Sequence, residues 1–205
     1  MHIGDGFLPA PLWAGGLAVS GAAAVAVLRR FDERRIPRIA LLTSVFFVAS
    51  SIRVPLPPGS LHLLLNGLVG VVLGWEAIPA ILLALFLQAI LLGHGGLTTV
   101  GINTLTMGGG ALAAHLCFQL RRCVRPSALR EPLLGLAASL CALLVSGGLY
   151  FLVLVAVDPG YRSTASVDLV AHTPLLVIEP LLTFATVSFL ARVKPELLGG
   201  TGVKS

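Results

Sequence analysis

The sequence has 205 residues, of which 56% are hydrophobic and only 11% are charged. Soluble domains carry about 25% charged residues, so this composition excludes an ordinary soluble protein. It predicts an all-α polytopic membrane protein, because each bilayer-spanning helix needs roughly 20 mainly apolar residues. Loops at an anionic cytoplasmic leaflet then explain the net charge of +5 better than nucleic-acid binding does.

Apolar runs between charges and Pro or Gly breaks predict seven transmembrane helices in a single domain, residues 1–205. In chain order these helices cover residues 11–28, 39–52, 63–74, 77–92, 104–120, 133–157 and 174–191. Only Trp75 and Glu76 separate the third helix from the fourth. Hydropathy alone therefore leaves open a merged helix and a total of six.

The positive charges favour seven helices. With seven helices and the N-terminus outside, twelve of the fourteen basic residues lie on the cytoplasmic side, and only Arg53 and Arg162 lie outside. Merging the two helices would place the basic cluster of residues 121–130 outside, against the positive-inside rule. We therefore predict a multi-pass protein of the cell (inner) membrane with an outer N-terminus and a cytoplasmic C-terminus.

Two further features concern partners. The sequence contains no GxxxxGK[S/T] phosphate loop, so we expect no ATP site in this chain and a partner that supplies the energy. In the first predicted helix, a stripe of small residues recurs every four positions, at Ala14, Ala18, Ala22 and Ala26. We expect this stripe to pack within the chain, and a docking face for another membrane subunit is the alternative.

The opening residues MHIGDGFLP place a histidine second in the chain, on the predicted outer side. The α-amine of Met1, the backbone nitrogen of His2 and the imidazole of His2 can close two fused chelate rings around one metal ion. Three nitrogens in a plane suit Ni(II) or Cu(II), and binding would deprotonate the backbone amide. A solvated terminal histidine is the simpler explanation for His2 alone.

A second histidine follows in the segment PPGSLHLLLNG, at the mouth of the third predicted helix and on the same side. His62 can supply the fourth nitrogen, although a capping or interfacial histidine is common. The outer loop GHGGLTTVGIN adds His94 and Asn103. These two residues are candidates for orienting a ligating imidazole, because such rings usually need a partner on their other nitrogen. A re-entrant turn with incidental polar groups is equally compatible with the loop.

The remaining candidates favour structural roles. We expect His115 and His172 to be packed or solvated, and Cys117, Cys123 and Cys141 to be packing residues, because their spacing fits neither a disulfide framework nor a metal site. Glu179 lies in the seventh predicted helix, where an acid is a functional candidate by default. Without an evident partner it is better interpreted as a buried, hydrogen-bonded group.

The three motifs MHIGDGFLP, PGSLHLLLNGL and GHGGLTTVGIN together resemble the substrate-binding membrane subunit of energy-coupling-factor cobalt and nickel transporters, the CbiM or NikM family. The likeness spans nearly the whole chain in motif order and spacing. It implies a seven-helix fold and a metal site on the Met1 amine, His2 and an imidazole that matches His62. It also implies a transmembrane coupling subunit, cytoplasmic ATPase subunits and, in many members, a small accessory membrane protein.

The sequence thus predicts the metal-capturing subunit of an ATP-driven Co(II) or Ni(II) importer, which is not an enzyme and supplies cobalamin synthesis or nickel enzymes. Four planar nitrogens favour nickel, whereas the residues of the first two motifs resemble those of the cobalt transporters in the family. A secondary transporter or channel for a small solute, using Glu179 or the glycine-rich loop, is the alternative. An intramembrane hydrolase is the weakest alternative, because no nucleophile and base form a motif.

Overall fold

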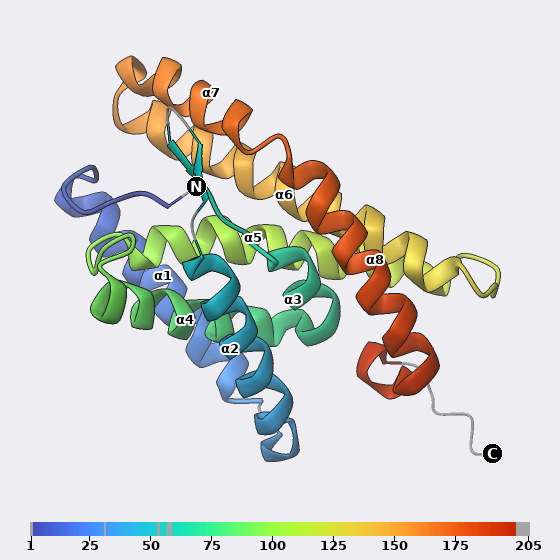
Figure 1. The fold of residues 1–205 in the computed structure, drawn as a ribbon. Helices are drawn as coiled ribbons and strands as arrows, with labels where there is room; N and C mark the ends of the chain where they lie inside the picture. Colours follow the sequence, from blue (N-terminus) through green and yellow to red (C-terminus); the bar gives the residue numbers. More distant parts are fainter. Residues whose placement is uncertain (1, 31, 53, 57–58, 200–205) are drawn as a thin grey trace.

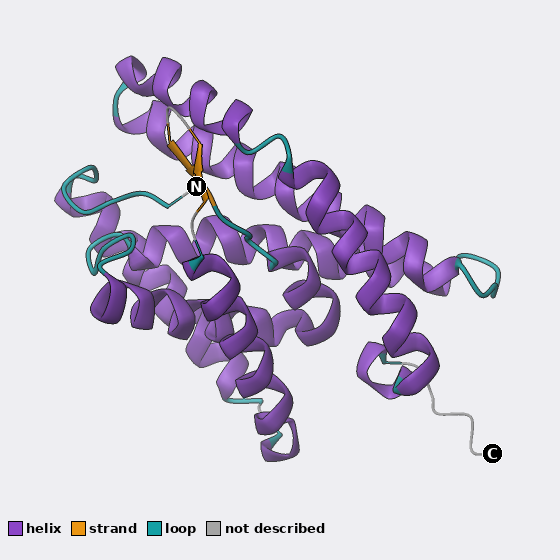
Figure 2. Ribbon diagram, in the orientation of Figure 1, coloured by secondary structure: helices purple, strands orange, loops and turns teal. Residues whose placement is uncertain are grey.

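The computed structural model describes residues 2–30, 32–52, 54–56 and 59–199. These residues form an almost entirely helical protein, as predicted (Figures 1 and 2). The helices are α1 (Ala10–Leu28), α2 (Ile36–Ser51), α3 (Asn66–Leu73), α4 (Ala77–Leu92), α5 (Val100–Gln119), α6 (Arg130–Val157), α7 (Arg162–Ala171) and α8 (Leu175–Val193). Short 3₁₀ turns at residues 33–35, 74–76, 120–122, 159–161 and 195–198 connect or end several of them.

Strands occur in the connection between α2 and α3, which the all-helical prediction did not include. β1 (Val54–Leu56) and β2 (Gly59–Leu61) pair antiparallel, with Val54 opposite Leu61 (Figure 2). The β-branched and proline residues of this stretch favour extended backbone over helix. The hairpin delivers the chain directly to His62.

Four helical stretches among the described residues are long and apolar enough to cross a membrane: Ala10–Leu28, Asn66–Leu92, Arg130–Val157 and Leu175–Val193. The second of these includes both α3 and α4. A turn separates the two helices where we expected a break, because Gly74 adopts φ +63° and ψ −127°. The count of seven transmembrane helices and the orientation of the termini stay predictions.

The structure corrects two predicted helix starts next to the candidate site and adds one helix that was not predicted. The third helix begins at Asn66 rather than at residue 63, because the preceding Leu65 is left-handed. The fifth begins at Val100, so Asn103 lies in the first helical turn and not in a loop. The polar helix α7 was not predicted at all, because its sequence RSTASVDLVA lacks the apolar length used to find spans.

Helix α5 crosses the middle of the molecule and contacts α1, α3, α4 and α6 (Figure 1). Glycines allow these close approaches. A Cβ at Gly101 would lie 2.3 Å from the backbone of Leu17 in α1, and one at Gly110 would lie 2.5 Å from the carbonyl oxygen of Ala142 in α6. Small residues serve this purpose between membrane helices. The core around α5 includes Met107, which is 1% exposed.

The alanine stripe of α1 does not pack within the chain, which corrects our expectation. Ala14, Ala18, Ala22 and Ala26 are all exposed, whereas Gly16, Ser20 and Ala24 are buried. The buried set is offset by two positions, which correspond to about 200° around an α-helix. The still smaller Gly16 faces α5, where Ile102 would lie 2.5 Å from an added Cβ.

The functional candidates and the basic residues gather in two different regions. We call the region of residues 2–8, 59–65, 94–103 and 159–172 the histidine end. The region of residues 29–38, 74–76, 120–131 and 192–198 is called the arginine end. Figure 1 shows these two regions at opposite ends of the helical bundle.

Candidate metal site

The segment that carries His62 is held by an acid from α8. Leu65 has φ +49°, a conformation that costs free energy in a residue other than glycine. The backbone N–H of Leu65 donates to Oε2 of Glu179 at 3.1 Å, and that of Leu64 donates to Oε1. Glu179 is fully buried, which confirms its interpretation as a buried, hydrogen-bonded group. Its carboxylate also lies at the positive N-terminus of α3.

The segment that carries His2 is held by an amide from α5. Oδ1 of Asn103 accepts from the backbone N–H of Ile3 at 3.0 Å, and Nδ2 donates to the carbonyl oxygen of Ile3, also at 3.0 Å. Both residues are 2% exposed. The pair of bonds fixes the backbone immediately after His2. In the structure, Asn103 therefore supports the segment itself through backbone contacts.

The glycine-rich loop closes over the same segment. The backbone N–H and the hydroxyl of Thr98 both donate to Oδ1 of Asp5, the first at 3.1 Å. A Cβ at Gly96 would lie 2.0 Å from the Asp5 carboxylate, so any larger residue there would displace the Asp5 side chain. His94 is half-buried just after the left-handed Gly93, and its N–H donates to the carbonyl oxygen of Gln88. The role of His94 beside a metal stays a prediction.

These contacts bring the rings of His2 and His62 together from segments 60 residues apart. The ring centroids lie 4.8 Å apart, with 34° between the ring planes. Two imidazoles can bind one metal ion with about 90° between the two metal–nitrogen bonds, each about 2.0 Å long. Their ring centroids would then lie about 4.5 Å apart. The observed separation suits two adjacent positions of a planar site. Met1, the third residue of the predicted site, lies outside the described residues.

A third imidazole lies against this pair. The His172 ring contacts the His62 ring nearly edge-on, with centroids 5.9 Å apart and an angle of 82°. We expected His172 to be packed or solvated, and the structure shows packing, with 4% of the residue exposed. Burial lowers the pKa of His172 below its ordinary value. The carbonyl and carboxylate of Asp168 act in the opposite direction and only partly offset this shift. The imidazole is therefore neutral near pH 7.

Sequence reasoning missed the importance of His172. Its signal was the spacing of Asp168 and His172, which places both on one face of a helix. The spacing indicates a shared face only in a helix, and the segment was interpreted as a loop. Recognising the polar stretch of residues 162–171 as an amphipathic helix would have revealed the pair.

Other candidates lie elsewhere. His115 is half-buried at the arginine end and contacts the Trp75 ring edge-on, which confirms its packing role. Cys117 and Cys141 are partly buried, but Cys123 is exposed, so the packing role predicted for Cys123 is wrong. Within the described residues, no three His, Cys, Asp or Glu side chains form a group that could hold a metal ion. A site at the histidine end thus needs donors beyond these side chains.

Comparison with known proteins gives a consistent result. A family model described as the cobalt uptake substrate-specific transmembrane region matches residues 2–197. A Haemophilus influenzae protein, provisionally named a metal transport protein, is 35% identical, and the alignment covers 98% of each chain. The fused nickel transport protein NikMN of Rhodobacter capsulatus is 32% identical over 97% of this chain, which spans 64% of the length of that protein.

A solved structure has the same fold. The crystal structure of a transition metal transporter superposes with a TM-score of 0.68 and 25% sequence identity. The match covers 94% of this chain and 93% of the other. The similarity therefore extends over nearly the whole chain.

Proposed function

The chain belongs to the CbiM family of cobalt uptake substrate-specific membrane proteins, and on this premise we propose that it captures Co(II), Ni(II) or both for an ATP-driven energy-coupling-factor importer. The metal is the transported substrate. Its ligands are the amine of Met1, the backbone nitrogen and imidazole of His2, and the imidazole of His62. The observation that carries this proposal is the 4.8 Å contact between the His2 and His62 rings.

The backbone around the two rings supports this assignment. Two buried side chains, Asn103 and Glu179, make four hydrogen bonds to the backbone next to His2 and His62. This arrangement fixes the positions of two ligand segments before the metal arrives, which lowers the ordering cost of binding. Both oxygens of Glu179 are engaged in this task, so the alternative of a solute pathway through Glu179 gains no support.

Partners belong to the proposal as well. We expect a transmembrane coupling subunit and cytoplasmic ATPase subunits, because the sequence lacks a phosphate loop. The name of the fused nickel transport protein indicates that relatives act with other transport components. The exposed alanine stripe of α1 offers a surface on which a second membrane helix can approach closely. A small accessory membrane protein and a location in the inner membrane complete the expectation.

Metal binding by the purified chain in detergent tests the site. We expect wild-type protein to bind one Ni(II) with the absorption bands of a planar nitrogen field. His62→Ala should lower the affinity at least about a hundredfold, because one of four donors is lost. The matched control is His115→Phe, a histidine in ring contact at the other end. Equal affinity and spectrum for His62→Ala and wild type would contradict the proposed site.

The amine is tested separately by inserting one bulky residue to give Met-Leu-His at the start. The insertion supplies an amine, two backbone amides and one imidazole from one strand, which leaves His62 without a position. We expect metal binding to persist but uptake of labelled cobalt or nickel into vesicles with the ATPase partners to be lost. Wild-type uptake by this variant would show that the amine is not a ligand in the transported state.

A further inference from the structure

The His62 ring is packed between two other imidazoles. The His2 ring lies on one side at 4.8 Å, and the His172 ring contacts it nearly edge-on at 5.9 Å. His62 and His172 are 5% and 4% exposed, so their contact is largely shielded from water. The orientation of a buried ring depends on the groups packed against it. His172 therefore influences the direction in which His62 presents its nitrogens.

His172 is itself held in one orientation. Its Nδ1 lies 2.7 Å from the carbonyl oxygen of Asp168 and 3.6 Å from Oδ1 of the same residue. A carbonyl oxygen only accepts hydrogen bonds, so Nδ1 carries the proton. Tyr150 in α6 interacts electrostatically with the Asp168 carboxylate. A chain of contacts thus runs from α6 through α7 to the ring that packs on His62.

The connection between α6 and α8 also contacts the segment that carries His2. The rings of Tyr161 and Phe7 lie 5.6 Å apart, just before α7. Helix α7 in turn contacts β2, the strand that leads into His62. Residues 159–172 therefore cover both histidine-bearing segments at once. A contact at each end of this stretch can hold the two segments in register.

We propose that His172 is a positioning residue of the metal site, which fixes the His62 ring in the orientation that allows both His62 and His2 to bind one ion. The inference rests on the proposed function. His172 acts through His62 and is not a ligand. Asp168 supports it, in the way that carboxylates and carbonyls orient histidines around metal sites. Loss of such a supporting group typically lowers metal affinity about 10- to 100-fold.

Two substitutions separate the ring contact from the hydrogen bond. His172→Asn retains a donor for the Asp168 carbonyl but has no ring to pack on His62. His172→Phe retains the ring and loses the donor. Using the full chain in detergent, we expect His172→Asn to bind Ni(II) about tenfold more weakly and to broaden or shift its absorption bands. His172→Phe should recover only part of the affinity and stay several-fold weaker than wild type, because the ring is kept but its support from Asp168 is lost. Identical affinity and spectrum for His172→Asn and wild type would overturn the inference.

A milder variant covers the case in which His172→Asn does not fold, as judged by thermal unfolding without metal. Asp168→Asn leaves all three rings in place and weakens only the support of His172. We expect it to lower the affinity for Ni(II) several-fold, with a broadened spectrum. Unchanged binding in Asp168→Asn would then overturn the inference. His115→Phe is again the matched control, because that ring also makes an edge contact but lies at the arginine end.

Comparing the His62 and His172 variants distinguishes this inference from the proposed function. If His62→Ala loses Ni(II) while His172→Asn binds as wild type does, the metal site stands and only the role of His172 fails. If His62→Ala itself binds normally, the proposed site fails first. A spectrum that changes only in the His172 variants identifies a change in the geometry of the ligands, which general destabilisation of the fold would not produce.

Discussion

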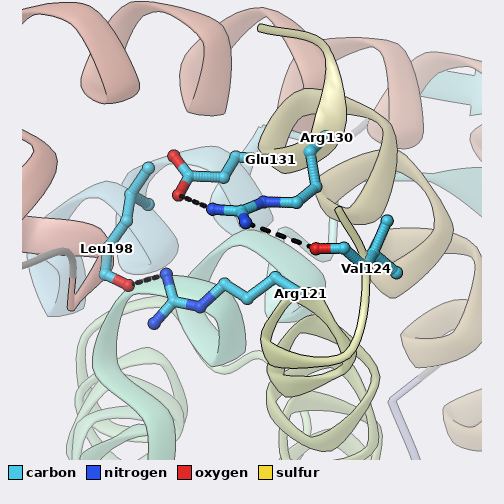
Figure 3. A network of polar contacts seen from close by, with 5 residues as sticks. All are labelled: Arg121, Val124, Arg130, Glu131 and Leu198. Carbon is cyan, nitrogen blue, oxygen red and sulfur yellow. Dashed lines mark hydrogen bonds and ion pairs between the residues drawn. The ribbon is translucent and has the colours of Figure 1, made fainter. Parts of the chain in front are cut away.

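The two ends of the bundle use polar side chains in different ways. At the histidine end, the fully buried Glu179 and the 2%-exposed Asn103 bond to backbone that is not helical. At the arginine end, Arg121 donates to the carbonyl oxygen of Leu198, and Arg130 contacts Glu131 at 3.3 Å and the carbonyl oxygen of Val124 at 3.4 Å (Figure 3). Those contacts join helix ends and turns.

This difference shows which kind of contact determines the local backbone structure. A buried backbone N–H that loses its acceptor costs about 1–3 kcal/mol, whereas an exposed ion pair contributes about 0–1 kcal/mol. The histidine end therefore depends on single side chains for its shape. The ion pairs of the arginine end are partly exposed, so each of them contributes less to the shape of that end. Four changes, from the largest expected effect to the smallest, break or sharpen this comparison.

Glu179→Leu should have the largest effect. It leaves the N–H groups of Leu64 and Leu65 without acceptors, so we expect the free energy of unfolding to fall by about 2–6 kcal/mol. Nickel binding should be lost with the His62 segment. Glu179→Gln keeps one good acceptor and should lose less on both measures. Thermal unfolding and calorimetry with Ni(II) measure the two effects, and wild-type values for Glu179→Leu would refute the role of Glu179.

Asn103→Leu should weaken metal binding more than it weakens the fold. The helix α5 survives the change, but the N–H and carbonyl of Ile3 lose their partners and the segment carrying His2 is released. We expect an affinity loss of about tenfold or more, with a destabilisation of about 1–3 kcal/mol. Hydrogen exchange at the amide of Ile3 should accelerate. Protection of that amide at the wild-type level would contradict the prediction.

Gly96→Ala should have an intermediate effect. Its Cβ would lie 2.0 Å from the Asp5 carboxylate, so Asp5 must move away from Thr98. We expect a several-fold loss of nickel affinity and little change in the melting temperature. Gly15→Ala is the matched control, because a Cβ there meets nothing within 4 Å. Equal nickel affinities of the two variants would show that the glycine-rich loop does not contribute to metal binding.

The ion pair between Arg35 and Glu76 at the arginine end should matter least. Arg35 Nη1 lies 2.9 Å from Oε1 of Glu76, but the Arg35 side chain is 54% exposed. We expect a double-mutant cycle with Arg35→Ala and Glu76→Ala to give a coupling energy below about 1 kcal/mol. Nickel affinity should not change. A fall in nickel affinity in Arg35→Ala would mean that the two ends are coupled.

The helices of this protein were largely predictable because composition and apolar length are local properties of the sequence. The two errors in helix starts have one cause in common, which is that a turn or cap depends on contacts from elsewhere. Leu65 is left-handed in a stretch of leucines that would otherwise favour helix, and the acceptor that satisfies its amide lies 114 residues away. The polar helix α7 was missed because apolar length was the criterion.

The candidate site divides in the same way. His2 and His62 were identified from their positions in two motifs, because a chelate at the start of a chain is defined by covalent geometry. The sequence also indicated a break near Gly74 and a cluster of basic residues at the loops. Glu179 and Asn103 were visible as polar residues in apolar surroundings, but nothing local indicated what they bind.

Only the tertiary structure decided which residues surround His62. His172 lies 110 positions away along the chain, yet its ring packs on His62 because α6 and α7 return the chain to the histidine end. The alanine stripe was equally ambiguous, since its exposure depends on which face of α1 meets α5. The sequence by itself determined the helical membrane class and indicated the candidate chelate at its start, which stays a prediction. Side-chain neighbours across helices depend on how the helices pack, and no local pattern contains that information.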